Sequence, residues 1–175
     1  MKRIFAAILI LMSVHAMAQQ SFDISKDKED GGLIFNGPIT FNDLNKEPSF
    51  NWLKSGYSEY KPKPQVLRYL NENLKNYSMV VFLGTWCDDS HTLVPKLEKV
   101  LDLVGVTPAG LTMYGVDREK HTKGGEYKTY DITLVPTIIL LRDNKEVGRI
   151  TESVQTTVEE DLVAIIRKDA STSGK

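Results

Sequence analysis

The chain has 175 residues, of which 41% are hydrophobic and 26% are charged, and its formal net charge is −1. This length suits one domain with a complete hydrophobic core, and the composition is typical of a globular protein. The nearly neutral charge, without a basic block or stripe, argues against nucleic acid and anionic membrane surfaces as partners.

The N-terminus has the pattern of a secretory signal peptide. Lys2 and Arg3 precede an apolar run over 4–14, and Ala16 and Ala18 are small residues at the two positions that a signal peptidase reads. A membrane anchor is the alternative, but the run is too short to span a bilayer. We predict that residues 1–18 are cleaved and that the mature protein is exported, periplasmic or secreted, without membrane attachment. Loss of Lys2 and Arg3 changes the net charge from −1 to −3.

Two segments precede the expected domain. Residues 19–32 are polar, carry mixed charges and end in two glycines, which predicts a flexible leader. Residues 33–63 are rich in aromatic side chains and are interrupted by prolines. We expect an irregular N-terminal extension with a short helix near 49–57, packed on the domain. Burial of these aromatic residues is favoured over the alternative, a partner-binding surface.

Residues 64–168 alternate between helical and strand patterns. Pro64 fits the first position of a helix, Pro95 predicts a kink, and Thr157 with Glu160 forms a capping box. The tail over 169–175 is polar and expected to be frayed. The predicted elements are a helix over 66–74, a strand over 79–84, a helix from 90, a strand over 111–116, a helical turn over 127–130, strands over 137–141 and 146–150, and a final helix from 158.

This order of elements indicates the fold class. A helix joins the first two strands, so these strands are expected to be parallel, whereas the last two form a hairpin. The sequence therefore predicts an α/β fold with a mixed central sheet.

Cys87 is the only cysteine, and it lies where a buried strand gives way to a helix. Free backbone N–H groups at a helix start favour a thiolate, whereas Asp88 and Asp89 oppose it. Exposed carboxylates are screened by water and salt, so we expect the N–H groups to have the larger effect. The alternative is an inert, buried Cys87, with Asp88 and Ser90 only capping the helix.

Three motifs resemble the thioredoxin family. Residues 82–90 are similar to its strand, its Trp-Cys-x-x-Cys motif and the start of its helix, and Pro95 lies eight residues after Cys87, as the kinking proline does in that family. Residues 130–137 are similar to its Tyr-x-Ile-x-x-(Ile/Val)-Pro-Thr segment. The resemblance covers about 64–168. It implies a thioredoxin-like three-layer sandwich with four or five strands in a mixed sheet flanked by helices.

The resemblance also implies a site around Cys87. It implies that the Val135–Pro136 bond is cis and faces the cysteine, with the backbone of Val135 free to pair with a bound peptide. Trp86 is expected to shield the thiol and to contact partners. Ser90 stands where the family has its resolving cysteine, and an alcohol is too weakly acidic to displace a thiolate.

Two further departures weaken the analogy. Asp88-Asp89 replaces the usual Gly-Pro, and Val81 occupies the position of a buried acid that assists proton transfer in thioredoxins proper. Dithiol reductase activity is therefore not implied. The chain most resembles exported bacterial thioredoxin-like proteins with a Trp-Cys-x-Asp-Ser motif.

We therefore expect a monothiol protein that exchanges or traps disulfides of proteins or small molecules. Cys87 and Ser90 are the catalytic candidates, and Trp86, Val135 and Pro136 are the substrate-binding candidates. One alternative is a non-catalytic binding or adaptor module. Another is a metal-binding protein using Cys87 and His91.

Other features of the sequence carry less information. We find no phosphate loop, nucleotide fingerprint or serine-hydrolase motif, and we expect no cofactor. His91 is expected to face solvent unless it binds a metal, and the charged run over 117–120 is expected to pair within itself. The oligomeric state is not predicted.

Overall fold

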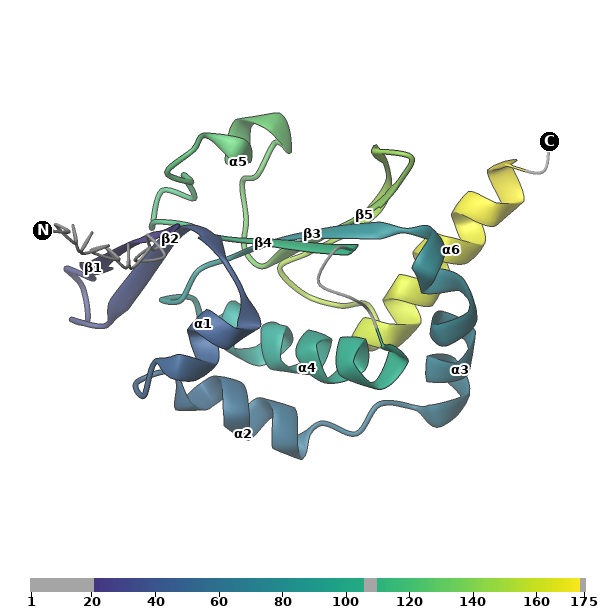
Figure 1. The fold of residues 1–175 in the computed structure, drawn as a ribbon, viewed down its shortest axis with the longest axis horizontal. Helices are drawn as coiled ribbons and strands as arrows, with labels where there is room; N and C mark the ends of the chain where they lie inside the picture. The colour runs from purple at the N-terminus through teal and green to yellow at the C-terminus, as the bar shows by residue number, and fades with distance from the viewer. Residues whose placement is uncertain (1–20, 106–109, 174–175) are drawn as a thin grey trace, which may run out of the picture.

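The computed structural model describes residues 21–105 and 110–173 (Figure 1). The predicted signal peptide and its cleavage site lie outside the described residues. In the part of the chain that is described, no helix is long and apolar enough to cross a membrane.

The centre of the fold is a six-stranded mixed sheet with the order β1-β2-β4-β3-β5-β6. Strands β3 and β4 are parallel, and every other neighbouring pair is antiparallel. The expected parallel pair and the expected hairpin are therefore both present. The strands are β1 (Asp23–Lys26), β2 (Leu33–Ile39), β3 (Ser78–Leu83), β4 (Leu111–Gly115), β5 (Thr137–Arg142) and β6 (Lys145–Thr151).

The long helices cover one face of this sheet, and α5 lies on the other face (Figure 1). Pro64 occupies the first turn of α3, and Pro95 lies inside α4 as predicted. The helices are α1 (Phe41–Lys46), α2 (Asn51–Glu59), α3 (Pro64–Asn73), the 3₁₀ turn η1 (Leu74–Asn76), α4 (Asp88–Val104), α5 (Glu126–Thr129) and α6 (Val158–Ser173).

Side chains of β3 divide between two hydrophobic clusters. Met79, Val81 and Leu83 face the larger cluster, which also contains the apolar sides of the long helices. Val80 and Phe82 face a smaller cluster on the opposite side, which includes residues of β5 and of the loop before it. This alternation is what a strand with both faces covered requires. It confirms the predicted α/β fold, with helices flanking a mixed sheet.

The N-terminal segments differ from expectation. Residues 23–26, placed in a flexible leader by composition, form β1 instead, and they pair with β2, which in turn pairs with β4. The sheet consequently has six strands rather than four or five. Phe22 anchors β1, since its ring packs 4.6 Å from that of Phe35. All four residues of β1 are exposed, and the strand is only four residues long, so its pattern in the sequence is too short to distinguish it from a polar leader.

The extension over 33–63 is regular rather than irregular. It contributes β2, α1 and α2, and α2 packs along α4 with Leu53 fully buried between them. At the other end, the predicted frayed tail begins within α6, which continues to Ser173. An ion pair of 2.7 Å between Arg142 and Asp169 holds this last part of the helix.

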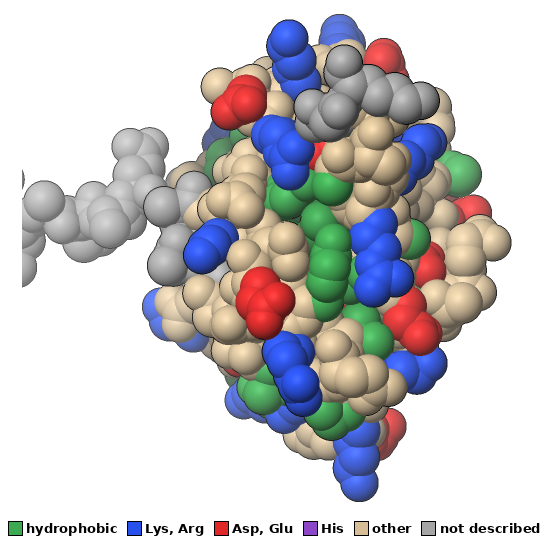
Figure 2. Space-filling view, turned by 90° about the vertical axis from the view of Figure 1, so that its right-hand side faces the viewer, with side chains coloured by type: hydrophobic (Ala, Val, Ile, Leu, Met, Phe, Trp, Pro, Cys, Tyr) green, Lys and Arg blue, Asp and Glu red, His purple; other side chains and the backbone are tan. Residues whose placement is uncertain are grey.

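The end of the molecule formed by α3 and α6 presents a strip of apolar side chains bordered by lysines and arginines (Figure 2). Tyr69 of α3 is half-buried, with the guanidinium of Arg167 4.9 Å from its ring centre. A cation over an aromatic face is a common surface arrangement, so this pair needs no ligand to explain it.

Candidate functional site

Cys87 lies in the turn between β3 and α4, at the N-cap position of the helix. Its N–H donates to the carbonyl of Gly84 at 3.1 Å, and its own carbonyl accepts from the N–H of His91 at 3.0 Å. The side chain is half-buried. Its thiol donates a hydrogen bond to the carbonyl oxygen of Val135, with 3.3 Å between sulfur and oxygen. The backbone therefore fixes Cys87 at the helix start while leaving part of the residue accessible.

Val135 and Pro136 end the loop that leads into β5. The peptide bond between them is cis, and both side chains are buried. Leu134, the preceding residue, is exposed. The fold thus brings together two candidate residues, Cys87 and Val135, that are 48 positions apart in the chain.

Trp86 is held in one orientation beside Cys87. Its indole Nε1 donates to the carbonyl of Val116 at 3.0 Å. A Cβ atom on Gly84 would lie only 2.7 Å from the indole ring, so the close approach of the ring requires glycine at that position. The cations of Arg118 and Lys120 lie 5.0 and 5.5 Å from the ring centre. The half-buried indole is therefore fixed in place, and Trp86 and Cys87 pack against the same small hydrophobic cluster.

Ser90 is fully buried, one turn into α4. Its hydroxyl oxygen accepts a hydrogen bond from the N–H of Gly84 at 3.2 Å, which ties the helix start to the end of β3. This hydrogen bond gives Ser90 a structural task at the position where the resemblance places a second thiol. Cys87 remains the only sulfur nucleophile of the chain.

His91 does not face solvent as expected. Its Nε2 lies 2.8 Å from the carbonyl oxygen of Thr85, and because a carbonyl only accepts, this nitrogen carries the hydrogen. The imidazole also stacks on Trp52, with ring centres 4.4 Å apart. Among the described residues, no group of three or more His, Cys, Asp or Glu side chains is placed to hold a metal ion. His91 therefore connects the helix start to α2.

Thr85 links the cysteine turn to the N-terminal part of the sheet. Its hydroxyl donates to the carbonyl of Leu33 at 2.7 Å and accepts from the N–H of Phe35 at 3.1 Å. Both of these groups lie in β2, about 50 residues away. Sequence reasoning missed Thr85, because a threonine between a strand and a helix gives no signal of such a distant partner.

Arg118 holds the loop between β1 and β2 against this site. It pairs with the buried Asp27 at 2.7 Å and with Glu29 at 2.6 Å, so the prediction that residues 117–120 pair among themselves is wrong for Arg118. Hydrogen bonds from Arg118 hold the pKa of the Asp27 carboxyl below its ordinary value, and the same bonds raise the pKa of Arg118. The guanidinium of Arg118 therefore lies between the β1–β2 loop, to which it is ion-paired, and the ring of Trp86.

Comparison with known proteins gives one family. The family model for thioredoxin matches residues 67–168. A thioredoxin from Chlamydia pneumoniae is 32% identical over 92 residues, which cover 53% of this chain and 81% of that protein.

Two solved structures are among those that resemble this chain. A crystal structure of an HIV epitope-scaffold has a TM-score of 0.50 and 14% identity, covering 75% of this chain and 84% of the scaffold. A protein of unknown function from Pseudomonas aeruginosa has a TM-score of 0.48 and 14% identity, covering 72% and 80% of the two chains.

Proposed function

Because the chain belongs to the thioredoxin family, we propose that it exchanges or traps disulfides through Cys87 without an internal resolving thiol. The thioredoxin-like fold supports a disulfide-related function, with thiols or disulfides as substrates. The finer proposal rests on one observation above all. Cys87 is partly accessible at a helix start, its sulfur lies 3.3 Å from the Val135 carbonyl, and Ser90 occupies the position of the second sulfur.

The first step is attack of the Cys87 thiolate on one sulfur of a partner's disulfide. A bond forms between the two sulfurs, the original S–S bond breaks, and the other sulfur leaves as a thiolate. Cys87 occupies the N-cap position of α4, where its side chain is half-buried. The indole of Trp86 and the backbone at Val135 and Pro136 are what a partner's chain would contact around the sulfur.

The second step needs a thiol from outside. A small-molecule or protein thiolate attacks the partner's sulfur in the mixed disulfide, forms a new disulfide with it and releases the Cys87 thiolate. The Ser90 hydroxyl does not replace this thiol, because an alcohol is a far weaker acid and nucleophile than a thiol at neutral pH. Without an outside thiol, the mixed disulfide persists and the protein acts as a trap.

We also propose that the mature chain is exported, which would place Cys87 in a compartment where partner disulfides persist. The support is the pattern of charged, apolar and small residues over 1–18. Mass spectrometry of the mature protein from the cell envelope or medium tests this proposal, and we expect an N-terminus at Gln19. An intact Met1 in a cytoplasmic fraction would contradict it.

Capture of mixed disulfides tests the central proposal. The protein is incubated with a peptide disulfide and analysed by non-reducing electrophoresis and mass spectrometry. We expect a covalent adduct on Cys87 that disappears on addition of a dithiol reductant. Cys87→Ser should form no adduct above background. Failure of the wild-type chain to form an adduct, with a sulfur that alkylates readily, would favour the non-catalytic binding module.

Ser90→Cys is the matched gain-of-function variant. Serine and cysteine differ by one atom, so the buried position tolerates the exchange better than most. In this variant a second sulfur near the helix start is expected to displace the trapped partner. The adduct should therefore shorten in lifetime while Cys87 forms a disulfide within the chain. An adduct as long-lived as that of the wild type would show that Ser90 is not placed to act on the mixed disulfide.

A further inference from the structure

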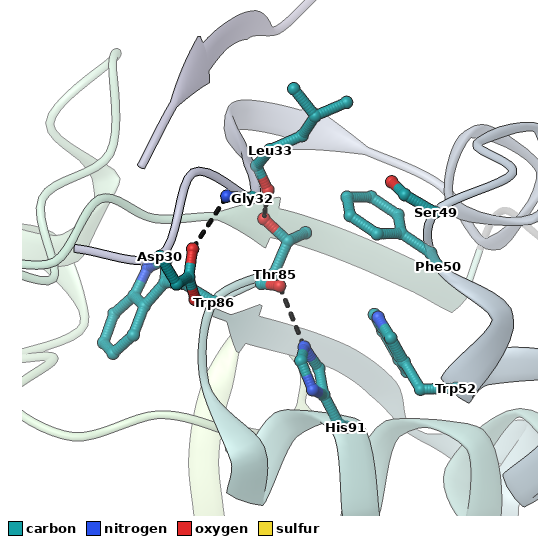
Figure 3. Close-up of a pocket in the computed structure, with 9 residues that line it drawn as sticks. All are labelled: Asp30, Gly32, Leu33, Ser49, Phe50, Trp52, Thr85, Trp86 and His91. Carbon is teal, nitrogen blue, oxygen red and sulfur yellow. Dashed lines mark hydrogen bonds between the residues drawn. The ribbon is translucent and has the colours of Figure 1, made fainter. Parts of the chain in front are cut away.

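A small cavity lies beside Trp86, on the side of the N-terminal segment (Figure 3). Its volume is about 180 Å³. Part of its wall comes from the Cys87 turn, and the rest comes from residues outside the region that matches the family model, 67–168. Its lining includes Asp30, Phe50, Trp52, Trp86 and His91.

The size of this cavity restricts its occupant. Sites for cofactors and other small molecules usually have volumes of about 300–1,000 Å³. A cavity of about 180 Å³ is smaller and suits a single amino-acid side chain. Because Trp86 directly precedes Cys87, this side chain would belong to a polypeptide joined to Cys87, and the inference therefore rests on the proposed function.

The walls of the cavity are mainly apolar and aromatic. Phe50 is buried beneath it, and Trp52 is kept in place by stacking on His91. His91 is itself fixed by its hydrogen bond to the Thr85 carbonyl. Figure 3 shows these rings on one side and Trp86 with Asp30 on the other. The stem of a long side chain would find fixed apolar surfaces here without any rearrangement.

A carboxylate lies at the rim. The Asp30 side chain is 59% exposed, and one of its oxygens accepts from the N–H of Gly32 at 2.7 Å. Its other oxygen lies 3.8 Å from Arg118, whose guanidinium is already paired more closely with Asp27 and Glu29. No lysine or arginine is among the described residues that line the cavity.

We infer that the cavity binds the side chain of a lysine or arginine adjacent to the reacting cysteine of a client polypeptide. The apolar stem lies along Phe50 and Trp52, and the cationic head meets the exposed carboxylate of Asp30. Asp88 and Asp89 are exposed at the start of α4 and add negative potential on the client's side. An acidic residue in the same place meets like charges. Clients with basic residues beside the cysteine are therefore preferred.

Short peptides test this preference. Each carries one cysteine as a mixed disulfide with thionitrobenzoate, with lysine, norleucine or glutamate next to the cysteine on either side. Norleucine keeps the length of the stem and lacks the charge. Attack by Cys87 on the peptide's sulfur releases thionitrobenzoate, a good leaving group that absorbs visible light. We expect the lysine peptide to react about fivefold faster than the norleucine peptide, and the glutamate peptide to react more slowly.

Asp30→Asn is the decisive variant. Asparagine still offers an oxygen to the Gly32 N–H, so the loop is expected to keep its turn. The rate advantage of lysine over norleucine, taken as the ratio of the two rates in the same variant, should disappear. Glu72→Gln removes an exposed carboxylate on α3, and it should leave the lysine advantage unchanged. A lysine advantage that survives Asp30→Asn would overturn the inference.

A second measurement separates the inference from the proposed function. Trp52 and Trp86 are the only tryptophans of the chain, and both line the cavity. Titration of Cys87→Ser with the lysine peptide, its cysteine replaced by serine, should change the tryptophan emission more than titration with the glutamate peptide. Equal emission and equal release rates with all peptides would overturn the inference and leave exchange at Cys87 intact. Preferential binding without release of thionitrobenzoate would overturn the proposed function instead.

Discussion

The two sides of the Cys87 site come from two parts of the chain, and only one of these parts carries a recognisable sequence motif. The side formed by Val135 and Pro136 lies inside the region that matches the family, and a short motif revealed it. The side formed by β2, α2 and the β1–β2 loop lies outside that region, and no motif indicated it. The comparison shows that a contiguous motif identifies the candidate cysteine, whereas its surroundings depend on contacts between distant segments.

The largest expected effect concerns whether the N-terminal side is an integral part of the domain. Leu53 is fully buried between α2 and α4. We expect Leu53→Ala to lower the free energy of unfolding by about 3 kcal/mol, because it leaves a cavity in the core. Denaturation with urea, followed by circular dichroism, measures this loss. Leu103→Ala is the control on the exposed side of α4, with an expected change below about 0.5 kcal/mol.

The form of the transition matters as much as its midpoint. A single cooperative transition shared by the N-terminal segment and the domain would support one folding unit. A separate early transition, or no loss of stability in Leu53→Ala, would show instead that α2 only rests on the family domain. The cavity beside Trp86 would then have a movable wall.

A smaller loss of stability is expected from a substitution where the N-terminal extension over 33–63 contacts α6. The hydroxyl of Tyr60 donates to the carboxylate of the buried Glu159 at 2.5 Å, and the backbone N–H of Lys63 donates to the other oxygen at 3.1 Å. Burial and this neighbouring carboxylate raise the pKa of Tyr60. Tyr60→Phe removes one partner of a buried charge and should cost about 2 kcal/mol, measured by urea denaturation.

Tyr57→Phe is the matched control for this loss. The Tyr57 hydroxyl bonds Asp102 at the surface, where water replaces the lost partner. We expect a change below about 0.5 kcal/mol. Equal losses in the two variants would mean that Glu159 recovers its hydrogen bonds from solvent.

The smallest expected effect is a pH dependence of the stability, which comes from Glu98. Burial raises the pKa of Glu98 to about 7, despite the hydrogen bond that it accepts from Asn45 of α1 at 2.9 Å. Between the ordinary pKa of about 4.5 and about 7, the folded chain holds a proton at Glu98 that the unfolded chain has lost. The contribution of this group to stability is therefore complete below about pH 4.5 and is lost as the pH rises through 7.

Glu98→Gln should remove this pH dependence. Glutamine resembles the protonated carboxyl and keeps the acceptor for Asn45. Since Glu98 is only half-buried and partly screened, we expect the variant to be more stable than the wild type by about 1 kcal/mol at pH 8, with little difference at pH 5. Urea denaturation at both pH values measures the difference, with Glu72→Gln as the control. Parallel pH profiles for wild type and Glu98→Gln would contradict this assignment.

Much of the family domain was predictable because its signals are local. The apolar run over 79–83, the proline in α4 and the turn at Asp143 and Asn144 each depend on neighbouring residues. Asp143 and Asn144 adopt the positive φ angles that a tight hairpin needs. The position of Cys87 at a helix start followed from the same kind of pattern.

The contacts that the sequence did not predict join residues that are far apart in the chain. Arg118 lies 91 positions from Asp27, and Thr85 about 50 from its partners in β2. No spacing rule connects such residues, so the charged run over 117–120 indicated only a solvated surface. The prediction that His91 faces solvent failed for the same reason. Its stacking partner, Trp52, lies on α2, and only the folded chain brings that helix close to His91.

The strand order has a consequence for how this molecule meets other chains. The outermost strands are β1 and β6, and they carry Asp23 and Lys26 on one border and Lys145, Glu146 and Arg149 on the other. Short borders with charged side chains are poor templates for an incoming strand, and they discourage fibre-like stacking. Under the proposed function, a client polypeptide tethered at Cys87 would therefore find no favourable border at which to add a strand to this sheet.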